Sequence, residues 1–426
     1  MAQTLDSVLA MVAPQNGEEF QPKGIANLFS SIIKRDESEA LLNAFLDNGQ
    51  DPLQALSAAT STIPYLFILS SRLSTVGAPP VHADFITTFC ESLDPIAIRC
   101  VPERIVKLAK GIIAFAESIR NLSFALEPLY NLATRYPPST HYLTAIHPLY
   151  LLICIQTRHF TSALPLISPP VSEIDRTITD LEYTDVLQYH YLSGIIFGVL
   201  KNYGDAESAF ELAATSPASA LSALQLEACK KHILIQLIRH GKVSPLPKYT
   251  YNHLIRHIKS NSTYQLLIKL YPVVKGQLQE TLTKEMDSFR EEGNAGLLQI
   301  ALARAPRWTL KNLMNTYLSL PLKQVVSSAG LSSETEAKEM VLSMIEDGEL
   351  SATLSPNGIL TFTEDSNPDV FHPKAIETVL RKAQVSGTYL EELNHNILKS
   401  RELLTKVGLV IHHYQIYGTY FHLPRL

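Results

Sequence analysis

Residues 333–362 read Ser333-Glu-Thr-Glu-Ala-Lys-Glu-Met-Val-Leu-Ser-Met-Ile-Glu-Asp-Gly-Glu-Leu-Ser-Ala-Thr-Leu-Ser-Pro-Asn-Gly-Ile-Leu-Thr-Phe362. Within residues 335–347 the apolar residues recur at three- and four-residue steps, which is the period of an amphipathic helix. Ser333 and Glu336 form a capping box at its start. The Asn-Gly pair at 357–358 then separates two short β-prone runs, a pattern typical of a β-hairpin. We therefore expect a helix followed by a hairpin.

Two further helical patterns precede this stretch, at residues 308–318 and 322–329. Three helices followed by a hairpin are the elements of a winged helix, which we expect at residues 306–365. Its last strand has an edge of unpaired N–H and C=O groups, and such an edge can pair with another chain. The residues predicted to form this subunit interface are Ile359, Leu360, Thr361 and Phe362.

Upstream, apolar residues recur at helical spacing over residues 25–305, and proline-rich turns separate the segments. Residues 194–213 combine small and aromatic residues at the spacing typical of tetratricopeptide repeats. A weaker copy lies at 150–167. These patterns predict an all-α fold, a right-handed TPR-like helical array followed by the winged helix and a C-terminal helix. The residues that carry the clearer pattern are Gly194, Phe197, Ala206, Phe210 and Ala213.

Four domains follow from this organisation. They are N-terminal helical repeats at 1–190, further helices at 191–305, the winged helix at 306–365, and a C-terminal helix with a tail at 366–426. Near the end we expect helices at 373–383 and at 388–407. The second has a narrow apolar seam, as in a coiled coil, which is expected to contact other subunits or to fold back onto the winged helix. The seam residues are Leu390, Leu393, Ile397, Leu404 and Val407.

Composition excludes several classes of protein. The 426 residues carry 36 Lys and Arg against 41 Asp and Glu, a net charge of −5, which argues against a general polyanion binder. The 18 glycines are few, and phosphate-binding glycine motifs are absent. The four cysteines are far apart, which fits a reducing compartment rather than a zinc knuckle. The apolar runs are too short for a membrane span, so we expect a soluble, intracellular chain with no membrane partner.

A helical array that runs into a winged helix resembles the PCI domain, which is named for the proteasome lid, the COP9 signalosome and a translation initiation factor. Within that group the chain is similar to the subunit 3 family of the COP9 signalosome. The tail at 408–426, which is aromatic and uncharged, departs from the acidic end usual there. The resemblance rests on the order of Leu143-Thr-Ala-Ile-His147, Ser162-Ala-Leu-Pro165, Gly194-Ile-Ile196, Leu200-Lys-Asn202, Gly241-Lys-Val243, Leu246-Pro-Lys-Tyr-Thr250 and Met344-Ile-Glu-Asp-Gly-Glu-Leu350.

This resemblance implies a non-catalytic scaffold of the complex that removes Nedd8 from the cullins of cullin-RING ubiquitin ligases. The expected direct partners are other PCI-type and deneddylase subunits, with cullin-RING ligases as indirect partners, in cytoplasm and nucleus. The alternative is a PCI subunit of the proteasome lid or of the initiation factor complex. In either case the winged helices of such assemblies are expected to align edge to edge.

No motif of the sequence predicts catalysis, a metal or a cofactor. The His-x-His signature of the zinc-binding isopeptidase is absent, as is the Gly-x-Ser-x-Gly motif. His253 and His257 are spaced to share a helix face, but no third ligand lies nearby in the sequence, so we interpret them as surface histidines. We therefore predict that the chain is not an enzyme.

The distribution of charge along the sequence distinguishes DNA binding from binding of an acidic protein partner. The third winged-helix segment, residues 332–350, has six carboxylates and one lysine, which disfavours insertion into DNA. In contrast, nine cations and no carboxylate lie between Ala228 and Gln279. They are either solvated helix faces or a dock for an acidic protein partner, with RNA as a lesser alternative. The candidate docking residues are Lys230, Lys231, Arg239, Lys242, Lys248, Arg256 and Lys259.

Overall fold

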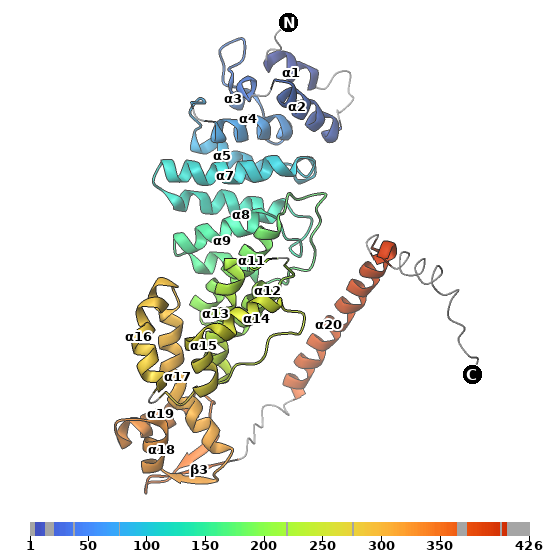
Figure 1. Ribbon diagram of the computed structural model, residues 1–426. Coiled ribbons are helices and arrows are strands. Elements are labelled where there is room, and N and C mark those ends of the chain that lie inside the picture. The colour runs from blue at the N-terminus through green and yellow to red at the C-terminus, as the bar shows by residue number, and fades with distance from the viewer. Residues whose placement is uncertain are drawn as a thin grey trace, which may run out of the picture. The chain divides into compact units, whose positions relative to one another are not determined.

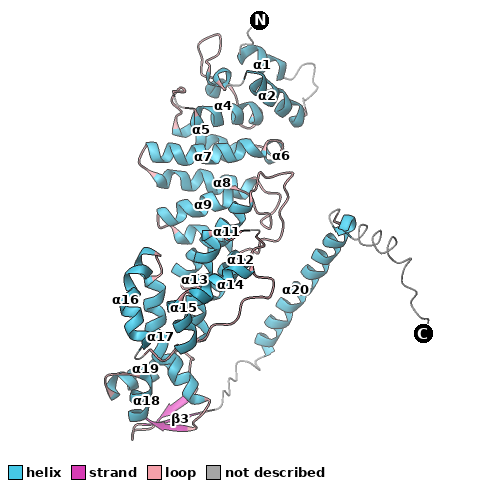
Figure 2. Cartoon of the chain, in the orientation of Figure 1, coloured by secondary structure: helices cyan, strands magenta, loops and turns pink. Residues whose placement is uncertain are grey.

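Helices make up most of the chain in the computed structural model (Figures 1 and 2). The structure describes residues 5–12, 21–36, 39–75, 77–218, 220–274, 277–363, 373–400 and 403–406. Two compact units are present, Met1–Leu310 and Lys311–Leu426. None of the described helices is both long and apolar enough to cross a membrane.

The first unit contains a succession of α-helices with three short 3₁₀ helices between them. The 3₁₀ helices are η1 (Ala40–Asn43), η2 (Leu122–Ala125) and η3 (Phe160–Ala163). The α-helices are α1 (Leu5–Val12), α2 (Pro22–Asp36), α3 (Pro52–Ala55), α4 (Thr62–Ser74), α5 (Ala83–Ser92), α6 (Pro95–Ile98), α7 (Pro102–Ser118), α8 (Leu126–Arg135), α9 (Ile146–Gln156), α10 (Leu164–Ile167), α11 (Tyr183–Val199), α12 (Tyr203–Thr215), α13 (Ala223–His240), α14 (Asn252–Ser260), α15 (Ser262–Leu270), α16 (Gln277–Glu291) and α17 (Ala295–Met314), which extends into the second unit.

The small residues of the repeat pattern allow neighbouring helices to approach closely. α12 packs on α11 and on α13, and α8 and α11 both pack on α9. An added Cβ at Gly194 of α11 would lie 2.8 Å from ring atoms of Phe210 on α12. Ala206 and Ala213 are fully buried in the same contact region. The predicted helical repeat is therefore confirmed at this pair, and the helices of the array bury a continuous apolar core.

Three helices, α7, α9 and α11, end with the same backbone conformation. At each turn a lysine or arginine adopts a left-handed conformation, and the next residue donates its N–H to a carbonyl five residues earlier, as in a Schellman motif. A non-glycine residue in this conformation costs roughly 1–2 kcal/mol, which a cation at a helix C-terminus offsets in part. The three residues, with φ of 55°, 61° and 60°, are Arg120, Arg158 and Lys201.

The second unit holds the winged helix, whose core lies between the helices and a small sheet. Its elements are β1 (Ser319–Pro321), α18 (Leu322–Ala329), α19 (Glu334–Glu346), β2 (Ala352–Leu354) and β3 (Ile359–Phe362). The predicted apolar stripe of α19 is correct, because Ala337, Val341 and Met344 are fully buried. Ser333 caps α19 by accepting the N–H of Glu336.

The sheet has three strands, one more than the sequence predicted. Its order is β1-β3-β2, and both neighbours of β3 are antiparallel. The prediction that Ile359, Leu360, Thr361 and Phe362 form an open edge is therefore wrong, because β3 is the central strand. The strand that was missed, β1, has only three residues and ends in proline, so it shows no alternation that a sequence pattern could reveal.

The C-terminal part also differs from the prediction. Instead of two helices at 373–383 and 388–407, one helix, α20 (Pro373–Lys399), runs without a break through Gly387. It ends before Ser400, whose hydroxyl accepts the N–H of Leu403 and starts a separate turn. Leu404 therefore follows a helix break, and Val407, the segment 364–369 and the tail at 408–426 lie outside the described residues.

Candidate functional site

The seven candidate docking cations divide into buried and exposed groups. Lys230 and Lys231 lie on α13 with only 7% and 6% of their surface exposed. The sequence pattern had assigned them to a polar helix face, but α13 is buried on nearly all sides. These two residues therefore cannot dock a partner, and that part of the prediction is wrong.

Internal carboxylates neutralise the two buried lysines. The Nζ of Lys230 lies 2.6 Å from Glu292 and 2.9 Å from Glu227. Burial lowers the pKa of Lys230, but the two carboxylates outweigh burial, so its pKa is raised. The Nζ of Lys231 donates to Asn294 Oδ1 at 2.8 Å, and burial lowers its pKa. Since Glu292 and Asn294 follow α16, this cluster ties α13 to the next helices of the array.

Arg239, at the end of α13, is also held internally. Its guanidinium lies 2.7 Å from a carboxylate oxygen of Glu207, which His240 contacts at 2.9 Å. Burial raises the pKa of Glu207, but the hydrogen bonds from Arg239, His240 and Gln236 outweigh burial and lower it. Arg239 is thus paired with a residue of α12, although its side chain stays 47% exposed.

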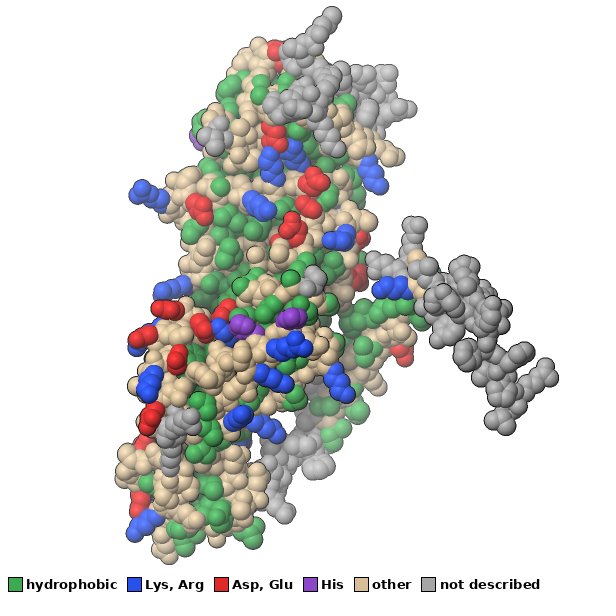
Figure 3. All heavy atoms as spheres, viewed as in Figure 1, with side chains coloured by type: hydrophobic (Ala, Val, Ile, Leu, Met, Phe, Trp, Pro, Cys, Tyr) green, Lys and Arg blue, Asp and Glu red, His purple; other side chains and the backbone are tan. Residues whose placement is uncertain are grey.

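The other four candidates are exposed and have no ion pair among the described residues. Lys242 and Lys248 lie in the connection between α13 and α14, and Arg256 and Lys259 lie on α14. Figure 3 shows lysine, arginine and histidine side chains gathered over this part of the first unit. The structure thus brings together four of the seven predicted residues on one short segment.

Packing around Gly241 fixes where this segment leaves α13. Gly241 has a φ of +69°, and an added Cβ would lie 2.5 Å from the ring of Trp308. The Trp308 Nε1–H donates to the carbonyl oxygen of Ile238 at 3.2 Å. Further along, the Ser244 N–H donates to Gln236 Oε1 at 3.0 Å. The connection is therefore anchored at its start, before Lys248 and α14.

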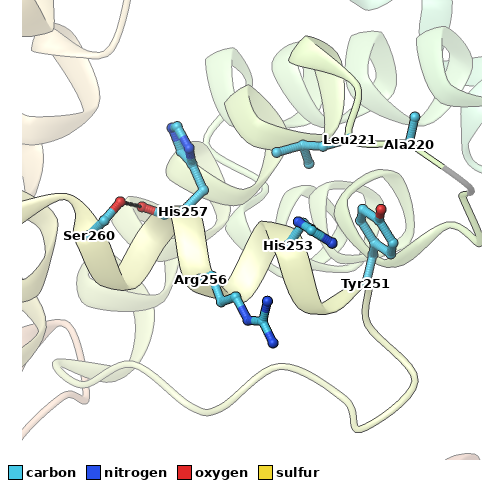
Figure 4. A pocket seen from close by; sticks show the side chains of 7 residues that line it. All are labelled: Ala220, Leu221, Tyr251, His253, Arg256, His257 and Ser260. Carbon is cyan, nitrogen blue, oxygen red and sulfur yellow. Dashed lines mark hydrogen bonds between the residues drawn. The ribbon is translucent and has the colours of Figure 1, made fainter.

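A shallow cavity of about 540 Å³ lies beside α14 (Figure 4). Tyr251 and His253 lie at one end and His257 and Ser260 at the other, with Leu221 across from the helix. The rings of Tyr251 and His253 stack, with centroids 5.0 Å apart. Arg256 and Ala220 complete the lining. Among the described residues, no three His, Cys, Asp or Glu side chains are placed to hold a metal ion.

Sequence reasoning missed the apolar part of this cavity. Ala220 and Leu221 come from the α12–α13 connection, about thirty residues before α14, and no periodic pattern links the two segments. It also missed Tyr249, whose side chain is 73% exposed beside Lys248. The proline-rich loop at 245–247 could have signalled an exposed aromatic residue, because such loops lie on the surface.

The α20 seam is partly exposed. Leu390 and Ile397 are 63% and 55% exposed, and Leu393 is half-buried. Because α20 is unbroken, the seam is longer than predicted. Ile376, which is also exposed, lies two heptads before Leu390, as Ile397 lies one heptad after it. Its role as a subunit interface stays a prediction.

The fold is that of a helical-repeat protein with a winged helix, followed by the long helix α20. Residues 25–254 match the family of N-terminal helical repeats of COP9 signalosome complex subunit 3. The COP9 signalosome complex subunit 3 of Dictyostelium discoideum is 30% identical over 353 residues, which cover 80% of this chain and 82% of that protein. The protein of the same name from Arabidopsis thaliana is 28% identical over 380 residues, 86% of this chain and 85% of that protein. The chain belongs to the COP9 signalosome subunit 3 family.

Proposed function

We propose that the chain is a non-catalytic scaffold subunit of the COP9 signalosome, the assembly that removes Nedd8 from cullins. The observation that carries this proposal is the length of the match, which includes 80% or more of the chain in both relatives. Its role is geometric, since it holds neighbouring subunits in register while a catalytic subunit elsewhere meets the neddylated cullin. The proposed partners are other PCI-type and deneddylase subunits, with cullin-RING ligases as indirect partners, in cytoplasm and nucleus.

The winged-helix sheet supports the scaffold role through one of its edges. The N–H of Ser355 donates to the carbonyl oxygen of Ile359, and the N–H of Thr363 donates to the carbonyl oxygen of Ser351, each at 2.9 Å. In an antiparallel pair the intervening residues point the other way, so Ala352 and Leu354 present their N–H and C=O groups at the outer edge of β2. On the opposite edge, Pro321 has no N–H, so β1 has one donor fewer for pairing with another strand. We therefore propose β2 as the pairing edge.

A proline at Leu354 tests this edge. Leu354→Pro removes an outward donor without breaking an N–H bond to β3, so the chain should keep its far-UV circular dichroism and melting temperature. Its affinity for neighbouring subunits, measured by biolayer interferometry, should fall about tenfold, the effect of losing about 1.4 kcal/mol. The matched control Ser319→Pro removes the outward donor of β1 and should bind like the unmodified chain. A folded Leu354→Pro protein with full affinity would exclude pairing through β2.

The non-catalytic role is tested with the purified chain. We expect it to bind no stoichiometric zinc by plasma mass spectrometry and to leave neddylated cullin intact on denaturing gels. Added to a complex reconstituted without it, the chain should restore assembly and, with it, cleavage. Chelator-sensitive cleavage by the isolated chain would refute the proposal, and so would full assembly and activity of the complex that lacks it.

A further inference from the structure

The exposed cations around α14 differ from those of α13, because Lys230, Lys231 and Arg239 on α13 are paired with carboxylates. Between Ala228 and Gln279 the sequence contains no carboxylate. Even so, the buried Lys230 and Lys231 are paired through Glu227, one turn earlier on α13, and Lys230 also through Glu292, which follows α16. The exposed cations on and before α14 have no such partner within the described residues. A surface with an uncompensated positive charge of this kind attracts and orients an anionic partner.

The cavity beside α14 adds a feature that charge alone lacks. Leu221 and Ala220 give it an apolar side, opposite the imidazoles of His253 and His257. At about 540 Å³, it falls within the size range of cavities that take small ligands or side chains. Pockets that combine apolar walls with a few placed polar groups fix both the position and the identity of what they bind.

We infer that this surface, the α14 groove, binds an acidic peptide segment of a partner protein, with one apolar side chain in the cavity. Carboxylates of the peptide lie against Arg256 and the cations beside it, and the apolar residue contacts Leu221. A peptide fits better than a single phosphate, because the cations extend from Lys242 to Lys259. RNA could stack a base on the exposed Tyr249, but it would leave the apolar side of the cavity at Leu221 and Ala220 without a role, so a peptide is favoured.

The inference concerns a surface of the chain itself and does not depend on the complex proposed above. It is tested on the full-length chain by fluorescence anisotropy, with a labelled peptide of about twelve residues that alternates Glu and Asp around a central Leu. Two matched peptides replace that Leu by Gly, or all the acids by Gln and Asn, and an oligouridine of similar length serves as the nucleic-acid probe. We expect saturable binding of the acidic peptide, weaker binding of its Gly version, and none of the Gln and Asn version.

Charge reversal locates the binding site. Arg256→Glu with Lys259→Glu should weaken binding of the acidic peptide about tenfold or more, because two favourable contacts become repulsive. The matched control, Lys284→Glu with Lys323→Glu, changes the net charge equally at exposed positions outside the groove and should have little effect. Ala220→Glu, at an exposed position of the cavity wall, should also abolish the preference for the central Leu.

Three outcomes would overturn the inference. These are peptide binding that survives both Arg256→Glu with Lys259→Glu and Ala220→Glu, equal losses in the control pair, or oligouridine binding tighter than the peptide and lost in the same variants. The last would make the groove a nucleic-acid surface. Circular dichroism of each variant separates loss of binding from loss of fold.

Discussion

Acidification from about pH 6.5 towards pH 4.5 is expected to destabilise the helical array strongly, because three of its histidines are held in their neutral form. His147 on α9 and His232 on α13 are each 3% exposed, and His190 lies on α11. Burial lowers the pKa of each ring from 6.5 to about 4. In the unfolded chain the same rings are hydrated, so they take up protons near their usual pKa.

The direction of the effect follows from where the protons bind. Between about pH 6.5 and 4 the unfolded state binds more protons than the folded state, so the free energy of unfolding falls as the pH falls. Each histidine contributes about 1.4 kcal/mol per pH unit in this window, or about 4 kcal/mol per unit for the three together. Over the whole window this amounts to about 10 kcal/mol, which is comparable with the roughly 5–15 kcal/mol by which a domain is stable, so the array should lose most of its stability.

Urea unfolding followed by circular dichroism at several pH values measures this slope. His232→Leu is the informative variant, because the Nε2 of His232 is buried without a hydrogen-bond partner in the described structure. We expect this variant to match the parent near pH 7.5 and to lose about 1.4 kcal/mol per pH unit less below pH 6.5. His395→Leu, at an exposed position of α20, is the matched control and should keep the full slope. A urea midpoint that stays constant down to pH 5 would contradict the prediction.

Short sequence patterns correctly predicted those parts of the fold that depend on residues close together in the sequence. The helix at 322–329 has the predicted bounds, and the apolar stripe of α19 is buried as its spacing indicated. The contact between Gly194 and Phe210 was also foreseeable, because a small residue at that spacing leaves room for the aromatic ring of the next helix. In each case the signal lies within a window of about twenty residues.

The predictions that were wrong concern features that depend on residues far apart in the sequence or on small differences in free energy. Lys230 is buried because Glu292, far along the chain, reaches it, and no sequence window contains both. The three-residue strand β1 forms because it pairs with β3, and not because its residues have a high β-propensity. Gly387 does not end α20, because a glycine costs only about 1 kcal/mol in a helix interior and good helix formers continue from Leu390.

Residues of the candidate groove show the same division. The cations around α14 could be predicted from composition, and the exposure of Arg256 and Lys259 follows from their position on a short amphipathic helix. The cavity could not, since it is formed by a loop that precedes α13 and a helix that follows it.

Aspartates at Leu393 and Ile397 are expected to prevent the chain from joining its complex, if the α20 seam is covered by another subunit. Both residues lie on the heptad stripe of a helix about 40 Å long. Ile397 is 55% exposed, as is expected for a surface that a partner covers. Full burial of a Leu or Ile contributes about 1.5–3 kcal/mol, so the pair should cost about 3–6 kcal/mol, or a factor of more than about 100 in affinity.

The alternative, in which the seam packs within its own subunit, is distinguished by which property is lost. For an intermolecular seam, Leu393→Asp with Ile397→Asp keeps the melting temperature of the isolated chain and fails to co-purify with the complex. The matched control, Thr388→Asp with His395→Asp, adds the same charge on the opposite side of α20 and should assemble normally. A large fall in the melting temperature of the isolated double variant would show that the seam is buried within its own subunit. A helix that packs only on other chains contributes nothing to the stability of the free subunit.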